Sequence, residues 1–217
     1  MKPSPNIIII GPQGSGKGTQ ARKLSGGLGF YHFSVGDALR DIAKQPTKLG
    51  HKVDAIINKK GGLVPFELVI ETTAKVVEKI PADQGIIFDG TPRRTEEIEP
   101  FNKIMKKVDR DITHVFFIDV PKAESIKRLS KRRVCELNGE QINIIVDDAR
   151  AIADCKARGG KVVYREDDEP AAIEKRLSWY QKQTKPVLDY FAAQGRLINI
   201  DGDQSIEDVH RDIMRHI

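Results

Sequence analysis

The stretch "NIIIIGPQGSGKGT", residues 6 to 19, joins an apolar run to a glycine-rich loop that contains Lys17 and ends on Thr19. Four consecutive isoleucines are typical of a strand buried on both faces of a parallel sheet. The loop matches G-x-x-x-x-G-K, in which glycines let successive N–H groups point at one anion while the lysine adds a mobile charge. The sequence therefore predicts a strand, a phosphate-binding loop and a helix in direct succession.

Four further short runs, rich in β-branched and aromatic residues, predict strands, and helical patterns lie between them. These runs are "FYHFS" (30–34), "GIIFD" (85–89), "THVFFIDV" (113–120) and "RLINID" (196–201). Alternating strands and helices indicate an open, doubly wound sheet with right-handed crossovers. We expect an α/β protein with a three-layer P-loop fold around a central five-stranded parallel sheet.

Two segments do not follow this alternation and are predicted to be insertions on the rim of the sheet. Residues 35–64 carry two helical patterns and no strand, whereas 133–165 mix Gly, Asn and Asp with short β-branched runs. Loops that grip a ligand usually lie at this rim. At 217 residues we expect a single domain, with a core formed by 1–34, 65–132 and 166–217.

Composition limits the classes of partner. The formal charge is +5, aromatic residues make up 6%, and the lysines are spread over helical faces without an aromatic stripe. We therefore expect no nucleic-acid partner. No apolar run approaches the roughly 20 residues that a bilayer requires, so we expect no membrane partner. The start "MKPSPNIIII" supports neither a signal nor a transit peptide, and we expect a cytoplasmic protein.

Six spaced motifs resemble the adenylate kinase family. They are "GPQGSGKGTQ" (11–20), "SVGDALR" (34–40), "KGGLVPFELV" (60–69), "DGTPRR" (89–94), "RLSKRRVC" (128–135) and "REDDEPAAIEKRL" (165–177). The resemblance implies transfer of the terminal phosphoryl group of ATP to a nucleoside monophosphate, with Mg²⁺ as cofactor. It also implies a monomer in which 35–64 form a helical monophosphate-binding subdomain and 133–165 form a small β-rich lid.

The resemblance assigns residues to the ATP side of the site. Lys17 is expected to grip the donor phosphates, and the spacing of Arg128 and Arg132 predicts that both lie on one face of a helix. The expected ATP-binding residues are Gly14, Ser15, Gly16, Lys17, Gly18, Thr19, Arg128 and Arg132. Asp89, at the end of its predicted strand, resembles the family carboxylate that organises Mg²⁺, and we expect its contact with the ion to be made through water. A carboxylate is a hard-oxygen ligand, which suits Mg²⁺.

The resemblance also assigns the acceptor and the reacting group. Phosphoryl transfer requires alignment and charge neutralisation, for which planar, permanently charged arginines are suited. The expected acceptor-binding residues are Val35, Arg40, Val64, Gly90, Arg93, Glu97, Arg165 and Arg176. The expected catalytic residues are Lys17, Arg93, Arg132, Arg165 and Arg176. Asp167 and Asp168 resemble the lid's partners for arginines, and Arg94 is expected to be surface charge.

The lid departs from the family members that bind zinc through two C-x-x-C knuckles. Cys135 is followed by Asn138, and Cys155 by Arg158, so half of the ligands are absent. Structural zinc is bound by four nitrogen or sulfur ligands, and we therefore expect none here. The two thiols could face each other across the lid, but a disulfide is disfavoured in a cytosolic protein, and the sequence leaves their redox state open.

The acceptor motifs also depart from the family pattern, at Val35, Thr91 and Glu97. Glu97 stands where the family has a glutamine that reads adenine, and an ionised glutamate only accepts hydrogen bonds. AMP is the expected acceptor, and another base, such as guanine in GMP, stays open. A one-residue slip in the matching, or a solvent-facing Glu97, would remove this difference. A non-catalytic nucleotide-binding protein is the remote alternative.

Overall fold

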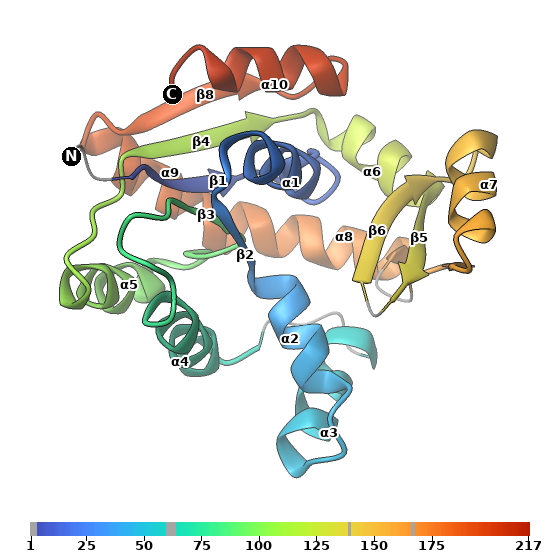
Figure 1. Ribbon diagram of the computed structural model, residues 1–217, viewed down its shortest axis with the longest axis horizontal. Helices are drawn as coiled ribbons and strands as arrows, with labels where there is room; N and C mark the ends of the chain where they lie inside the picture. Colours follow the sequence, from blue (N-terminus) through green and yellow to red (C-terminus); the bar gives the residue numbers. More distant parts are fainter. Residues whose placement is uncertain (1–3, 60–63, 139, 166–167) are drawn as a thin grey trace.

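The computed structural model describes residues 4–59, 64–138, 140–165 and 168–217 (Figure 1). In chain order the elements are β1 (Asn6–Ile10), α1 (Lys17–Leu28), β2 (Tyr31–Ser34), α2 (Val35–Ala43), α3 (Lys48–Asp54), the π-helical η1 (Ala55–Lys59), α4 (Phe66–Val77), β3 (Ile86–Asp89), α5 (Thr95–Lys107) and β4 (His114–Asp119). There follow α6 (Lys122–Lys131), β5 (Arg132–Leu137), β6 (Glu140–Ile145), α7 (Ala149–Ala157), β7 (Lys161–Val163), α8 (Pro170–Trp179), the π-helical η3 (Tyr180–Thr184), α9 (Lys185–Ala193), β8 (Leu197–Asp201) and α10 (Ile206–Met214).

The central sheet is parallel and has the strand order β2-β3-β1-β4-β8. All five residues of β1 are buried, as expected for a strand with helices on both faces. The register pairs Ile9 with Asp89 on one side and with Phe116 on the other. This arrangement confirms the predicted α/β class and five-stranded parallel sheet, and it brings the carboxyl ends of β1 and β3 to the same edge.

Alternate residues of β1 belong to two separate apolar clusters. Ile8 and Ile10 pack in a cluster with α2, α4, α5 and α9, whereas Ile7 and Ile9 pack with α1 and α10. Because successive side chains of a strand point to opposite faces, one short run supplies both interfaces of a three-layer fold. Figure 1 shows α1 and α10 on one side of the sheet, and α4 and α5 on the other.

The two predicted insertions project from this core at different places (Figure 1). The described part of 35–64 is helical and contains α2, α3 and η1. The second insertion contains a three-stranded antiparallel sheet, in the order β6-β5-β7, together with α7. Helix α7 was not expected from the sequence; it is capped by the Asp148 side chain, which accepts a hydrogen bond from the Ala151 N–H.

Arg132 does not lie on the helix that carries Arg128, and this prediction is wrong. Helix α6 ends at Lys131, and Arg132 has an extended backbone with φ −69° and ψ 137°. The reason is its pairing: Arg132 begins β5, where it lies opposite Ile145 of β6. Tertiary pairing with the small sheet therefore overrides a spacing that suits a helix, and Arg132 stands at the junction of core and lid.

Candidate functional site

The loop between β1 and α1 has the conformation that the glycine pattern predicts. Gly14 and Gly16 have φ of +85° and +90°, a region that side chains other than glycine rarely adopt. A Cβ at Gly14 would also come within 2.8 Å of the Ser125 carbonyl oxygen, so α6 packs directly on the loop. Ser15 is buried, and its hydroxyl has no hydrogen-bond partner among the described residues. The loop is thus a cradle for an anion at a helix N-terminus.

Lys17, the first residue of α1, is the centre of the positive charge in the site. Burial lowers the pKa of Lys17 to about 7; Asp89 opposes this shift, and the guanidinium groups of Arg93, Arg176 and Arg132 add to it. Its Nζ atom donates a hydrogen bond to the Pro12 carbonyl oxygen at 3.2 Å. Four cationic side chains from four parts of the sequence therefore gather here, which favours a ligand with several negative charges.

Asp89 ends β3 beside the loop, as predicted from its position after the apolar run. It is 9% exposed, and a Cβ added to Gly18 would lie 3.1 Å from its Oδ2 atom. Burial acts to raise the pKa of Asp89, but His32, Lys17 and Arg93 together hold it below its ordinary value. Asp89 is therefore an ionised carboxylate facing the start of α1.

His32 was missed by the sequence reasoning, although it lies in a predicted strand. Its Nε2 atom is 3.6 Å from Asp89 Oδ2, and both side chains are largely buried. Strands β2 and β3 are adjacent and parallel, with Ser34 paired to Asp89, so His32 approaches the carboxylate from the neighbouring strand. Only the strand order, which the sequence did not predict, could have identified this contact.

A large cavity of about 470 Å³ lies between the glycine-rich loop and the second insertion. It brings together seven of the eight residues predicted for ATP. They are Gly14, Gly16, Lys17, Gly18, Thr19, Arg128 and Arg132. The opposite wall is formed by Asn143, Ile144, Ile145 and Asp147 of the insertion and by Ile206 of α10, none of which was predicted. The volume falls in the range of nucleotide-sized ligand pockets.

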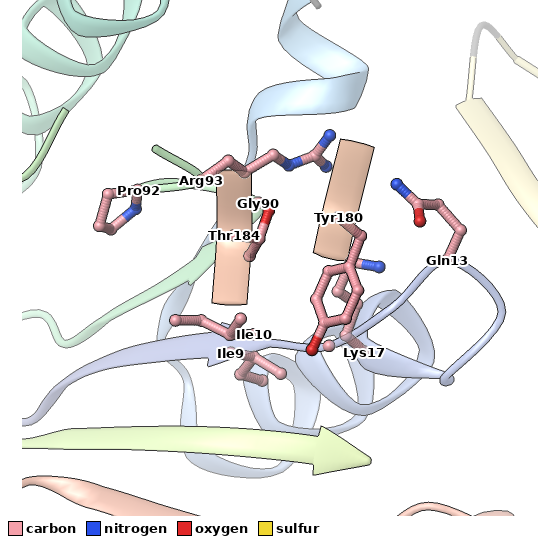
Figure 2. A pocket seen from close by; sticks show the side chains of 10 residues that line it. Ile9, Ile10, Gln13, Lys17, Gly90, Pro92, Arg93, Tyr180 and Thr184 are labelled. Carbon is pink, nitrogen blue, oxygen red and sulfur yellow. The ribbon is translucent and has the colours of Figure 1, made fainter. Parts of the chain in front are cut away.

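A second, smaller cavity of about 20 Å³ adjoins the first, because Lys17 lines both. Figure 2 shows Lys17, Gly90, Arg93, Tyr180 and Thr184 around it. Gly90 has φ +93°, and a Cβ there would lie 2.6 Å from Arg93 Nη2, so glycine is required where the guanidinium crosses the backbone. Tyr180 and Thr184, the two ends of η3, were not predicted; a π-helical turn in a long helix is a frequent feature of functional sites.

Asp168 holds two of the predicted arginines. It is 1% exposed, and it accepts hydrogen bonds from Arg132 Nε at 2.7 Å and Arg132 Nη2 at 2.5 Å. Arg176 Nη1 lies 3.6 Å from the same carboxylate. The prediction that Asp168 pairs with arginines is confirmed, whereas Asp167 lies outside the described residues. Arg165 is partly exposed three residues earlier, and its backbone carbonyl accepts a hydrogen bond from the Asp168 N–H.

Three of the predicted acceptor residues, Val35, Arg40 and Val64, lie within the first insertion. Val35 and Val64 are buried in the same apolar cluster, and Arg40 is paired with Asp37 on α2. Burial acts to raise the pKa of Asp37, but Arg40 and the Ser34 hydroxyl lower it overall. Glu97 is buried in the first turn of α5, so the alternative of a solvent-facing Glu97 is wrong.

Comparison with known proteins gives matches over nearly the whole chain. The family model for adenylate kinase matches residues 9–196. Adenylate kinase from Staphylococcus aureus strain Mu50 is 38% identical over 209 residues, which cover 96% of this chain and 97% of that protein. Adenylate kinase from Staphylococcus epidermidis strain RP62A is 36% identical over the same shares of the two chains.

The chain belongs to the adenylate kinase family. Membership confirms the resemblance of the six motifs and makes the protein a nucleoside monophosphate kinase of the ATP:AMP phosphotransferase type. Neither the family match nor the curated relatives favour GMP as the acceptor. Within the described ranges, none of the helices is both long and apolar enough to cross a membrane.

The adenylate kinase lid of this chain differs from the sequence prediction, because Cys135 and Cys155 form a disulfide. The sequence reasoning disfavoured this disulfide, and the structure corrects it. Strand β5 and helix α7 pack together, so the two Cα atoms lie 5.9 Å apart in a small apolar cluster with Leu137. A Cβ at Gly160 would come within 2.9 Å of both sulfurs, so the turn before β7 leaves the space that the cross-link occupies.

Arg94 also differs from the prediction of a surface charge. Its side chain is only 17% exposed, and its Nη2 atom donates a hydrogen bond to the Val64 carbonyl oxygen at 2.7 Å. Its Nε atom lies 3.9 Å from Glu97 Oε1. In the adenylate kinase motif no arginine is expected here, so motif matching gave no signal, and a contact across 30 residues could not be read from the sequence.

Proposed function

We propose that this protein transfers the terminal phosphoryl group of ATP to AMP, which yields two molecules of ADP. The observation that carries the proposal is the position of Lys17, which lines both the large cavity at the glycine-rich loop and the small cavity bordered by Arg93. A donor nucleotide on one side and an acceptor phosphate on the other would meet at this lysine. Family membership supplies the reaction class.

The reaction requires alignment and charge neutralisation more than covalent chemistry from the protein. A phosphate oxygen of AMP forms a bond to the γ-phosphorus of ATP, while the bond from that phosphorus to the β,γ-bridging oxygen breaks and ADP leaves. Charge spreads over the three remaining oxygens of the transferred group. Burial, and then the neighbouring arginines, lower the pKa of Lys17. The same arginines would stabilise the charge on the transferred group.

The roles of the individual residues are proposed on this basis. The donor phosphates would lie in the cradle formed by Gly14, Ser15, Gly16, Lys17, Gly18 and Thr19, with Arg128 and Arg132 beside the nucleotide. The acceptor would contact the set formed by Val35, Arg40, Val64, Gly90, Arg93, Glu97, Arg165 and Arg176. Lys17, Arg93, Arg132, Arg165 and Arg176 would surround the transferred group, which suits planar bidentate donors.

Mg²⁺ bound with ATP would neutralise phosphate charge, and the residues present fit this cofactor. Asp89 supplies a hard carboxylate oxygen beside the start of α1, and its lowered pKa keeps it ionised. Zinc is not proposed for the lid: within the described ranges no three His, Cys, Asp or Glu residues are placed to hold a metal, and both cysteines are in the disulfide.

Residues 35–64 and 133–165 are proposed to close over the acceptor and the donor, respectively. Closure would exclude water as a competing acceptor and would complete the ring of arginines. We also propose that the protein is a cytoplasmic monomer and that it binds neither nucleic acid nor membranes.

The function is tested by coupled phosphotransfer with ATP and Mg²⁺ against AMP, GMP, CMP, UMP and dAMP. We expect AMP to give the highest kcat/KM, at least about tenfold above GMP, because recognition of a base edge typically changes binding by more than 1.4 kcal/mol. The absence of turnover with every monophosphate would refute the enzyme assignment. Higher kcat/KM with GMP would refute the acceptor assignment alone.

Lys17 gives a prediction about pH. Because its pKa is about 7 in the free protein, Lys17 is largely neutral at about pH 8, and the triphosphate restores the charged form. We expect ATP binding at about pH 8 to take up close to one proton, and at about pH 6 close to none. The ATP affinity should accordingly fall as the pH rises above 7.

Calorimetry of ATP binding in buffers of different ionisation enthalpy measures this proton uptake. A Lys17→Met variant should lose the uptake at about pH 8, whereas Lys23→Met, which removes a surface ion pair with Glu207 at 2.8 Å, should keep it. Equal uptake by wild type and Lys17→Met would show that another group takes up the proton.

A further inference from the structure

Arg94 links two segments of the acceptor side that are 30 residues apart in the sequence. It is the last residue before α5, with an extended backbone at φ −130° and ψ 153°, and its guanidinium reaches the Val64 carbonyl at 2.7 Å. Val64 is the residue at which the first insertion returns to the core. The contact therefore joins the end of that insertion to the loop that contains Arg93.

Among the described residues, the first turn of α4 provides no hydrogen-bond donor for the Val64 carbonyl oxygen. Val64 is 4% exposed, and the first turn of α4 donates its N–H groups to the Pro65 carbonyl instead, from Leu68 and Val69. A buried carbonyl without a hydrogen bond is unfavourable. The charged donor from Arg94 satisfies it and thereby fixes the backbone that precedes α4.

Glu97 completes the arrangement from the other side. Its Oε2 atom accepts a hydrogen bond from the Arg93 N–H at 2.7 Å, and its Oε1 atom faces Arg94 Nε at 3.9 Å. The carboxylate is thus engaged by the loop itself. Glu97 holds the backbone of Arg93 and balances the charge of Arg94, which in turn holds Val64.

We propose that Arg94 is a positioning residue of the acceptor site, which together with Glu97 keeps the Val64 segment and the Arg93 loop at a fixed separation. Arg94 acts through these neighbours and need not touch the nucleotide. The inference rests on the proposed function, because Val64 and Arg93 are proposed there to contact AMP. It also gives Glu97 a role in the shape of the site, in addition to the acceptor contact proposed above.

The test is a steady-state comparison of wild type with Arg94→Met, Arg94→Lys and Glu97→Gln. We expect Arg94→Met to raise the KM for AMP about tenfold, equivalent to about 1.4 kcal/mol, with the KM for ATP and kcat changed by less than about twofold. Arg94→Lys keeps one donor for Val64 and should return the KM for AMP to within about threefold of wild type. Arg215→Met, at an exposed arginine paired with Asp212, is the control and should change nothing.

Glu97→Gln keeps an acceptor for the Arg93 N–H and should therefore retain AMP over GMP. In a double-mutant cycle, Arg94→Met and Glu97→Gln should be less than additive on the KM for AMP, because the two side chains act on the same loop. An unchanged KM for AMP in Arg94→Met, or an equal change in both KM values and kcat, would overturn the inference. Wild type without activity on any monophosphate would instead overturn the proposed function.

Discussion

Replacing Arg93 with methionine is expected to lower kcat with AMP about a thousandfold, while the dissociation constant for ATP stays within about twofold of wild type. Arg93 borders the small cavity with Lys17, and its guanidinium lies against the Gly90 backbone (Figure 2). Methionine keeps much of the apolar length and removes every donor. The loss should therefore fall on the step in which charge develops on the transferred group.

Two further variants define the effect of Arg93. Arg93→Lys keeps the charge but not the bidentate geometry, and it should recover only part of kcat. Lys103→Met, on α5, breaks an exposed ion pair with Glu99 at 2.7 Å, and it should behave like wild type. Equilibrium ATP binding and steady-state kinetics measure the two quantities separately. Normal turnover by Arg93→Met would remove Arg93 from the catalytic set.

Replacing Asp168 with asparagine is expected to lower the free energy of unfolding by about 2–3 kcal/mol and the melting temperature by about 5–10 °C. Asp168 is completely buried as a side chain, and it carries the hydrogen bonds of Arg132 and an ion pair with Arg176. The amide removes the negative charge that Arg132 and Arg176 share. Because both arginines are 17–20% exposed, water reduces the loss below that of a fully buried pair.

Activity should fall in the same variant, because Arg132 and Arg176 lose the carboxylate that orients them toward Lys17. We expect kcat to fall about tenfold, a smaller change than for Arg93 since both arginines are still present. Asp154→Asn is the matched control: Asp154, on α7, forms an exposed ion pair with Arg158, and its loss should alter stability by less than about 1 kcal/mol. A melting temperature of Asp168→Asn equal to that of wild type would show that the contacts of Asp168 with the two arginines do not stabilise the fold.

The predictions that succeeded rest on neighbouring residues in the chain. β1, the glycine-rich loop and α1 follow one another without interruption, and the geometry of each determines the start of the next. Asp89 could be placed for the same reason, since a carboxylate that ends a buried parallel strand must lie at the edge where ligands bind. The residues of the glycine-rich loop were accordingly expected together, and most of them line one cavity.

The failures concern contacts that are made across the sequence. Arg132 leaves the helix because β6 pairs with it, and Arg94 is buried because Val64 lies beside it. His32 meets Asp89 only because β2 is the neighbour of β3 in the sheet. Patterns of residue type report local conformation, whereas these three contacts depend on which elements become neighbours.

The disulfide was not predicted, for a different reason. The sequence reasoning relied on the expected cytosolic location and did not consider that β5 and α7 pack together. Its position has a mechanical consequence for the proposed closure. Both half-cystines lie inside 133–165, one on β5 and one on α7, and the cross-link therefore spans the interior of the lid and not its junctions with the core. Oxidation stiffens the lid against bending while its hinges keep their freedom to rotate. In the proposed closure, the lid would therefore rotate as one rigid body, and the surface that it turns toward the donor would keep its shape.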